Sequence, residues 1–167
     1  MQTLVETKIY FESKEGMVRD SILEDIHILS KNLRNEDKTE IWYSHHKIPE
    51  EALFEGFKNS VICLTVERNS QPIIIFGIVP ITILGNMATI WMLASDKIRY
   101  IPKSFAKHSR KFINMFLGYY PYLENWVSCA NTKSIEWLKY LGATIGKPEI
   151  YGIEKQFFRH FYFKRSY

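Results

Sequence analysis

The sequence predicts a single α/β domain spanning residues 1–167, with a mixed, mostly antiparallel, curved sheet of about seven strands and helices on both faces. The length of 167 residues fits one domain that can enclose a core. The expected order is strand, three helices, three strands, helix, strand, helix and two strands. One strand–helix–strand unit among hairpins indicates one parallel pair in an otherwise antiparallel sheet. The aromatic share of 15% supplies bulky side chains for the interior.

The N-terminal segment predicts a strand followed by an amphipathic helix. Leu4 to Phe11 is rich in β-branched and aromatic residues, and turn-forming residues 14–16 end this run. Met17 to Asp20 either extends or restarts the strand. Ser21 and Glu24 have the spacing of a capping box at a helix start. The helix is expected to reach about Leu33, with a buried stripe of Ile22, Ile26, Leu29 and Leu33.

Two further helices are expected before the main sheet. Asn35 can cap a short helix from Glu36 to about Ser44, with Ile41 and Trp42 as its apolar anchors. Pro49 suits the first position of the next helix. The inward-pointing side chains of that helix are expected to be Leu53, Phe54 and Phe57.

Three apolar, β-branched runs predict an antiparallel meander in the middle of the chain. The runs are Val61 to Glu67, Pro72 to Val79 and Met87 to Ala94. Turn residues at 68–70 and 84–86 separate them.

The C-terminal half adds two helices and three strands. Pro102 and Ser104 open an amphipathic helix that ends near Gly118. A second helix runs from about Thr132 to Leu141, and Gly142 is well placed as its left-handed C-terminal cap. The strands are expected at Leu123 to Cys129, Thr144 to Tyr151 and Phe157 to Phe163.

Composition excludes several classes of protein. No stretch reaches the roughly 18 apolar residues of a membrane span, and the charged N-terminus does not match a secretory signal. Cys63 and Cys129 fall in strand-like runs and are expected to be structural thiols. The adjacent His45 and His46 lack the companions of a metal site, so no metal is expected.

The formal net charge of +4 permits attraction to polyanions without requiring it. Basic residues gather along the helix from Lys103 to Lys111 and at the C-terminus from Arg159 to Arg165. We interpret both clusters as solvated faces and rank nucleic-acid binding last.

The run from Asn131 to Ala143 carries a resemblance to a known superfamily. It places an Asn at a strand end, a small residue at Ser134 and a glycine at the helix terminus, Gly142. Together with the order of elements, this run resembles the closing motif of the GNAT superfamily of acyl-CoA-dependent N-acetyltransferases.

Three shorter segments narrow the resemblance. Residues 75–77, 91–93 and 120–125 look like the GNAT-like proteins of tailed phages, a group that includes the internal virion protein A family of short-tailed phages. The likeness covers residues 17–151.

The resemblance implies an acetyl-CoA site where the third meander strand and the strand from Leu123 to Cys129 splay apart. The exposed backbone of Met92, Leu93 and Ala94 would pair with the amides of the pantetheine arm. Asn131 and Ser134 of the closing motif are further candidates to bind the cofactor. Asn131 as a helix cap and Ser134 as a small packing residue are the preferred alternatives.

Two positions depart from the pattern of the superfamily. The pyrophosphate loop, normally rich in glycine, corresponds to residues 95–102, which contain Asp96 and no glycine. Arg99 and Lys103 could supply the missing positive charge. The Tyr that normally reprotonates the leaving thiolate corresponds to Leu138. Tyr140 lies about 200° around the helix from that position and is expected to face elsewhere.

Acidic and aromatic residues provide the remaining candidates. Glu36, Asp37 or Glu40 could act as the general base that deprotonates an acceptor amine; the alternative is a solvated helix start matched to the helix dipole. Trp42 and Trp91 could wall a substrate cleft, although a role in the core is the simpler interpretation of either one.

Two functional hypotheses remain open. The first is a phage-encoded acyl-CoA-dependent N-acetyltransferase with a degenerate pyrophosphate loop, acting on a host protein or a small amine. The second is a non-catalytic virion or host-interaction protein that retains the fold, with virion components as partners. Either protein is expected in the host cytoplasm or packaged into a particle from it.

Overall fold

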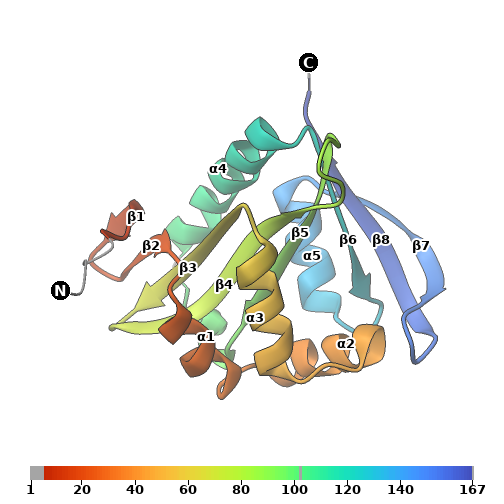
Figure 1. Ribbon diagram of the computed structural model, residues 1–167, viewed down its shortest axis with the longest axis horizontal. Coiled ribbons are helices and arrows are strands. Elements are labelled where there is room, and N and C mark those ends of the chain that lie inside the picture. Colours follow the sequence, from red (N-terminus) through yellow and green to blue (C-terminus); the bar gives the residue numbers. More distant parts are fainter. Residues whose placement is uncertain (1–5, 102, 167) are drawn as a thin grey trace.

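The chain forms one eight-stranded sheet with helices on both faces (Figure 1). The computed structural model describes residues 6–101 and 103–166, with side chains for all of these except residues 103–105. In chain order the elements are β1 (Ile9–Ser13), β2 (Gly16–Asp20), α1 (Leu23–Ser30), α2 (Asn35–His45), α3 (Pro49–Asn59), β3 (Ile62–Arg68), β4 (Gln71–Pro80), β5 (Met87–Ala94), η1 (Asp96–Tyr100), α4 (Lys103–Tyr119), β6 (Tyr122–Ser128), α5 (Thr132–Leu141), β7 (Thr144–Tyr151) and β8 (Gln156–Lys164).

The spatial order of the strands is β1-β2-β3-β4-β5-β6-β8-β7. All neighbouring pairs are antiparallel except β5 and β6, which are parallel and joined through η1 and α4. This single parallel pair confirms the mixed sheet that the order of elements predicts. Helices α1 and α3 lie on one face, and α4 and α5 lie on the other (Figure 1).

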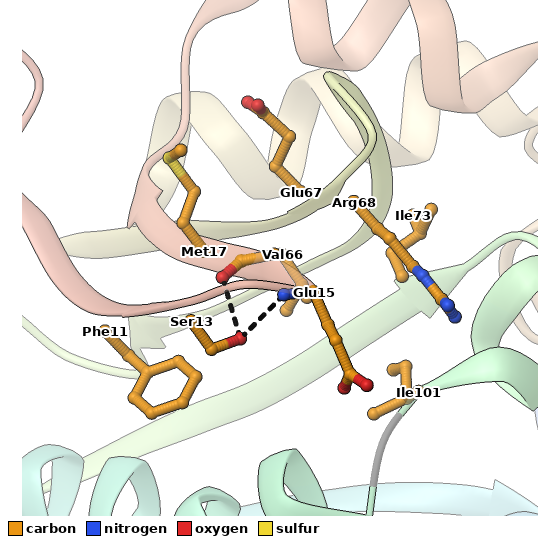
Figure 2. Close-up of a pocket in the computed structure, with 10 residues that line it drawn as sticks. Phe11, Ser13, Glu15, Met17, Val66, Glu67, Arg68, Ile73 and Ile101 are labelled. Atoms are coloured by element: carbon orange, nitrogen blue, oxygen red, sulfur yellow. Dashed lines mark hydrogen bonds between the residues drawn. The ribbon is translucent and has the colours of Figure 1, made fainter.

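The sheet has one strand more than expected because the first predicted strand is a hairpin. β1 and β2 pair through a turn in which the Ser13 hydroxyl donates to the Gly16 carbonyl and accepts from the Glu15 amide (Figure 2). A Cβ at Gly16 would lie 2.3 Å from the Glu67 carbonyl oxygen, so this close approach requires glycine. The hairpin covers a cavity of only about 20 Å³, which is too small for a cofactor. Leu4, the expected start of the first strand, lies outside the described residues.

Helix α1 is shorter than its hydrophobic periodicity indicates. It begins one residue later than expected, and the Asp25 carboxylate, not that of Glu24, accepts the Ile22 amide at 2.9 Å. The helix ends at Ser30, and Leu33 instead forms a β-bridge with Ser95. A tertiary contact therefore overrides the continuing apolar stripe.

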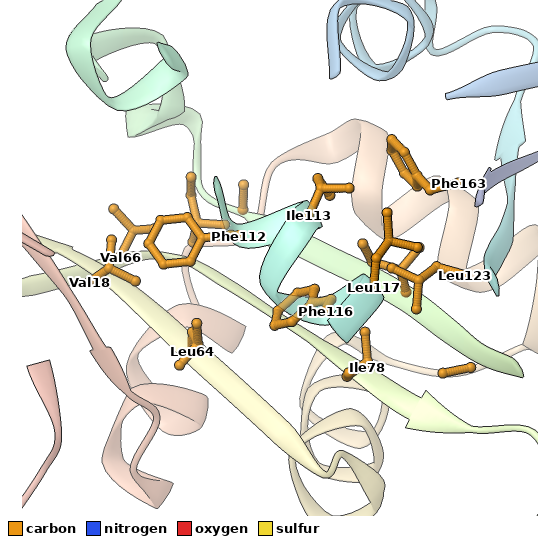
Figure 3. Packing of buried hydrophobic residues seen from close by; sticks show 14 of the residues in the cluster. Val18, Leu64, Val66, Ile78, Phe112, Ile113, Phe116, Leu117, Leu123 and Phe163 are labelled. Carbon is orange, nitrogen blue, oxygen red and sulfur yellow. The ribbon is translucent and has the colours of Figure 1, made fainter. Parts of the chain in front are cut away.

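Two hydrophobic clusters, one on each face, hold the helices to the sheet. Between α4 and the sheet, Phe112 and Phe116 pack above Leu64 and Ile78 (Figure 3). The second cluster contains Ile26, Leu29, Leu33, Ile41, Leu53 and Ile75.

Two aromatic residues expected inside are exposed. Phe54 of α3 is 45% exposed, and Trp42 of α2 is 47% exposed and stacks on His46. In residues 6–101 and 103–166, no helix is long and apolar enough to cross a membrane.

Candidate functional site

The centre of the sheet contains a fork between its two parallel strands. β5 and β6 pair over only three positions, from Met87 with Tyr122 to Thr89 with Glu124. At the next position the Asn125 side chain donates to the Ile90 carbonyl oxygen at 2.8 Å. Beyond this contact β5 and β6 no longer pair with each other, and they diverge toward their C-terminal ends (Figure 1). The predicted splaying of the third meander strand from the strand Leu123 to Cys129 is therefore confirmed.

A cleft of about 950 Å³ passes through the sheet at this fork. On the α3 side its wall includes Gly56 and Trp91, and on the opposite side it includes Phe112 of α4 and Leu138 of α5. Because β5 and β6 separate, the cleft has walls on both faces of the sheet. A ligand in it could reach from one face to the other.

Helix α2 bridges the open end of the fork. The Asp37 carboxylate accepts the Ala94 amide from the end of β5 at 2.8 Å. The Glu40 carboxylate, one turn later, accepts the Ser128 amide from the end of β6 at 3.0 Å. Asp37 also pairs with the buried Arg34, whose Nη2 donates to Oδ1 at 2.9 Å. Two acidic side chains thus satisfy backbone donors that the separated strands leave unpaired.

Glu40 combines two fixed hydrogen bonds with access to the cleft. Its Oε1 also accepts from Asn131 Nδ2 at 3.1 Å, and no donor contacts its Oε2 in the described part of the chain. Burial raises the pKa of Glu40 from its ordinary 4.5 to about 7, although the bonds from Asn131 and Ser128 oppose the rise. This carboxyl group can therefore gain and lose a proton near neutral pH.

Asp37 and His45 differ from Glu40 in their environment. Burial raises the pKa of Asp37, while the hydrogen bonds from Arg34 and Ala94 act against the rise. Both Asp37 oxygens already accept hydrogen bonds from these two residues. Burial lowers the pKa of His45, and nearby Lys47 lowers it further.

Near the end of β5, one residue directs its backbone N–H and C=O toward the fork. Ala94 turns its N–H to Asp37 and its carbonyl oxygen to the Arg34 amide, away from β4. Because hydrogen bonding alternates along a strand, Met92 presents its N–H and C=O to the fork, whereas Leu93 pairs with β4. Of the three predicted positions, Met92 therefore has the accessible edge.

The predicted pyrophosphate segment is the short helix η1. The amides of Ile98 and Ile101 donate within this turn, to the carbonyl oxygens of Ser95 and Ile98. Arg99 and Asp96 both line the cleft and are exposed, and Arg99 Nε donates to the Asp96 carbonyl oxygen at 3.0 Å. The side chain of Lys103 lies outside the described residues.

The N-terminus of α5 contributes to the cleft as well. Asn131 caps the helix by accepting the Ser134 amide at 3.3 Å, which agrees with the preferred interpretation of this residue. The Ser134 hydroxyl accepts from Arg34 at 3.2 Å and lines the cleft. The Tyr140 ring lies under the Arg110 guanidinium of α4, which agrees with the expectation that it does not share the position of Leu138.

The predicted aromatic walls are separated in the structure. Trp91 lines the cleft, and its Nε1 donates to Ser60 Oγ at 2.9 Å. Trp42 lies on the outer surface of α2, stacked on His46 with ring centroids 4.6 Å apart. Glu36, also exposed, lies at the edge of the cleft.

Sequence reasoning missed two aromatic residues and one cation of the cleft. Trp126 stacks on Tyr151 with ring centroids 4.5 Å apart, and both line the cleft. Burial raises the pKa of Tyr151, so its hydroxyl stays protonated near neutral pH. Lys133, in the first turn of α5, also lines the cleft. No local sequence pattern connects residues so far apart in the chain. The position of Lys133, two residues after the Asn131 cap, could have identified it as a candidate.

The chain resembles one known protein family over part of its length. Residues 72–148 match the family described as bacteriophage T7, probable scaffold protein Gp13. No curated protein sequence matches the chain.

Solved acetyltransferase structures share the fold. A spermidine N-acetyltransferase from Vibrio cholerae, in complex with CoA and spermine, is 15% identical, with a TM-score of 0.61 over 91% of this chain and 96% of that one. An acetyltransferase of the GNAT family from Streptococcus pneumoniae is 14% identical, with a TM-score of 0.62 over 91% and 100%. A ribosomal-protein-S5-alanine acetyltransferase from Vibrio fischeri is 14% identical, with a TM-score of 0.65 over 92% and 95%. The chain therefore has the GNAT acetyltransferase fold.

Proposed function

We propose that the protein is an acetyl-CoA-dependent N-acetyltransferase with its thioester arm in the fork between β5 and β6. The observation that carries this proposal is the cleft through the sheet, with the accessible edge of Met92 on one side and Glu40 at its end. The fold, shared with a spermidine acetyltransferase that holds CoA, supports it.

The residues present fit the two halves of the cofactor differently. The N–H and C=O of Met92 can pair with the amides of pantetheine as another strand would. Helix η1 has no glycine-rich cradle, so the phosphates would be held by the side chains of Arg99 and Lys133, and by Lys103. The side chain of Leu93, which lines the cleft, would contact the arm, whereas Ala94 is fully buried and its backbone N–H and C=O are already paired with Asp37 and Arg34.

Glu40 is the proposed general base. An acceptor amine is protonated in water and must lose a proton before it can attack a carbonyl carbon. Glu40 Oε2 would take that proton, with Oε1 held by Asn131 and Ser128. Asp37 holds the ion pair with Arg34 and keeps α2 in place, while Glu36 at the edge of the cleft would attract the cationic acceptor.

Bound acetyl-CoA would supply the activated acetyl group. The amine nitrogen would form the new amide bond as the carbon–sulfur bond of the thioester breaks, and the sulfur would leave as thiolate. Leu138 cannot donate a proton, and a thiol with a pKa of about 8.5 can leave without one. The nitrogen would release its second proton as the amide forms, and this proton would reach the thiolate through water, so that the products are the amide and the CoA thiol. Trp91, Trp126 and Tyr151 would wall the acceptor side.

Calorimetry and thiol release test the proposal together. Titration with acetyl-CoA should give saturable binding, and a thiol-reactive dye should report CoA release with amine acceptors such as spermidine or a lysine peptide. E40Q should bind acetyl-CoA normally and release CoA roughly 100-fold more slowly. Absence of binding at millimolar acetyl-CoA would overturn the proposal.

The match to a phage scaffold family favours a second candidate function. In this alternative the chain retains the fold without catalysis and contacts other virion components or a host protein, in the host cytoplasm or inside the particle. The glycine-free η1 and Leu138 agree with a loss of activity. Purified virions analysed by mass spectrometry test it: the chain should be present in stoichiometric amounts, and its absence from particles would contradict a structural role.

A further inference from the structure

The connection between β4 and β5 ends in an aliphatic turn that nothing in the described chain covers. Ile83 is 100% exposed and Leu84 is 98% exposed. These are the two central residues of a turn closed by the Gly85 amide, which donates to the Thr82 carbonyl oxygen at 3.3 Å. Ile81 and Met87 flank the turn, and the Ile81 amide donates to Met87 at 3.1 Å. We call Ile81, Ile83, Leu84 and Met87 the apolar tip.

The residues of the apolar tip have no conformational reason to be aliphatic. Central turn positions favour Gly, Pro, Asn, Asp and Ser, which relieve backbone strain or satisfy the turn's own polar groups. Two adjacent aliphatic side chains in water also reduce solubility. The turn is closed by hydrogen bonds, so it holds both side chains away from the fold.

Polar and cationic residues lie behind the apolar tip at the same end of the sheet. Met87 pairs with Tyr122, which pairs with Lys164, so these three residues form one row across β5, β6 and β8. The Arg165 amide donates to the Pro121 carbonyl oxygen beside this row. Figure 1 shows the connection projecting next to the ends of β8 and α4. Tyr119, the last residue of α4, is 63% exposed.

This end of the molecule carries charge of one sign. The segments that meet here are residues 58–61, 80–88, 117–123 and 163–166. They contain Lys58, Lys164 and Arg165 and no Asp or Glu. Aliphatic side chains at the front, with tyrosines and cations behind, match the layers of a lipid surface: hydrocarbon, interface and anionic headgroups.

We infer that the apolar tip inserts into the outer hydrocarbon of an anionic lipid bilayer, with Lys164 and Lys58 against the headgroups. Ile83 and Leu84 are both almost fully exposed in a closed turn, so a protein pocket would have to enclose the turn on several sides. Fluid hydrocarbon accepts side chains in any direction. The attachment is peripheral, which agrees with the lack of a spanning helix in residues 6–101 and 103–166. It does not depend on acetyl transfer.

Co-flotation with vesicles tests this inference directly. The wild-type protein should float with phosphatidylcholine vesicles that contain phosphatidylglycerol, and less with pure phosphatidylcholine or at high salt. The double variant I83S/L84S should lose at least about 100-fold in partition, since each aliphatic side chain in hydrocarbon is worth roughly tenfold or more. K164Q should weaken binding to anionic vesicles only.

A matched pair of exposed isoleucines provides the control. Ile150 and Ile153 are 65% and 55% exposed near the turn between β7 and β8, away from the apolar tip. I150S/I153S should float like the wild type, and I83S/L84S should keep the wild-type melting temperature because the replaced side chains make no buried contacts. In a separate variant, L84W, fluorescence should shift to the blue when anionic vesicles are added.

Two results would overturn the inference. One is equal flotation of wild type and I83S/L84S. The other is an absence of flotation combined with self-association that I83S/L84S removes, which would assign the tip to contact with a second copy of the chain.

Discussion

Asp37 and Glu40 lie one turn apart on α2, and each carboxylate accepts a backbone N–H from the end of a different strand. One helix turn therefore spans the open end of the fork between β5 and β6. Asp37 contributes a buried ion pair, and Glu40 contributes a carboxyl group that titrates near neutral pH. The same helix both holds the strands apart and places the proposed base.

Replacing Asp37 tests the structural half of this arrangement. D37A leaves the guanidinium of Arg34, which is 9% exposed, without its partner, and it also frees the Ala94 amide. We expect a loss of about 3 kcal/mol in the free energy of unfolding, measured with urea. E36A, one residue earlier and exposed, should change stability by less than about 0.5 kcal/mol. Similar small losses in both variants would show that α2 does not depend on the ion pair.

The titration of Glu40 should appear in the pH dependence of stability. Its pKa is about 7 in the folded protein and near 4.5 when exposed, so the folded state binds the proton more tightly. This difference contributes about 3 kcal/mol to the free energy of unfolding. The contribution is fully present below pH 4.5 and is lost as pH rises through about 7. Urea unfolding at several pH values should show this decline in the wild type and in E36Q. It should be absent in E40Q, and an unchanged slope in E40Q would contradict the assignment.

A single glycine sets the position of the Trp91 ring. A Cβ at Gly56 would come within 2.6 Å of Trp91 Cζ2, so G56A must displace the indole or α3. We expect a loss of about 1–3 kcal/mol and a changed tryptophan emission. Gly118, on α4, has no atom within 4 Å of such a Cβ. G118A should therefore be neutral or slightly stabilising, and comparable losses in both would point to a general intolerance of these helices.

Sequence patterns predicted elements best where local chemistry decides their ends. The bounds of α5 follow from the Asn131 cap and from Gly142, which has a φ of 95°. The end of α1 was wrong because Leu33 continues the apolar spacing but pairs with Ser95, a contact that no local pattern contains. The β1–β2 hairpin was only one of two alternatives because its turn depends on the approach of Glu67.

Less of the site than of the fold could be predicted from the sequence. The acidic start of α2 suggested Glu40, but its partners Ser128 and Asn131 are 88 and 91 residues away. The sequence gives no reason to treat Trp42 and Trp91 differently. The orientation of α2 places Trp42 on the outer surface, whereas Trp91 lines the cleft. Trp126 and Tyr151 meet because β6, β8 and β7 are neighbours, which requires the sheet order.

Lysines at the two ends of α5 allow a direct phosphate contact to be distinguished from a general effect of positive charge. K133A should weaken acetyl-CoA binding about tenfold in calorimetry, because Lys133 lines the cleft at the helix start. K139A removes the same charge at the far end of the helix and should have little effect. Pantetheine, which has no phosphates, should bind both variants like the wild type. Equal losses for acetyl-CoA in both variants would indicate long-range attraction instead of a contact.

Hydrogen exchange at the Met92 amide tests the central claim most directly. If the pantetheine arm lies in the fork, acetyl-CoA should slow exchange at Met92, with little change at Leu93, which already pairs with β4. Protection confined to other parts of the chain, or none at saturating acetyl-CoA, would contradict a cofactor site between β5 and β6.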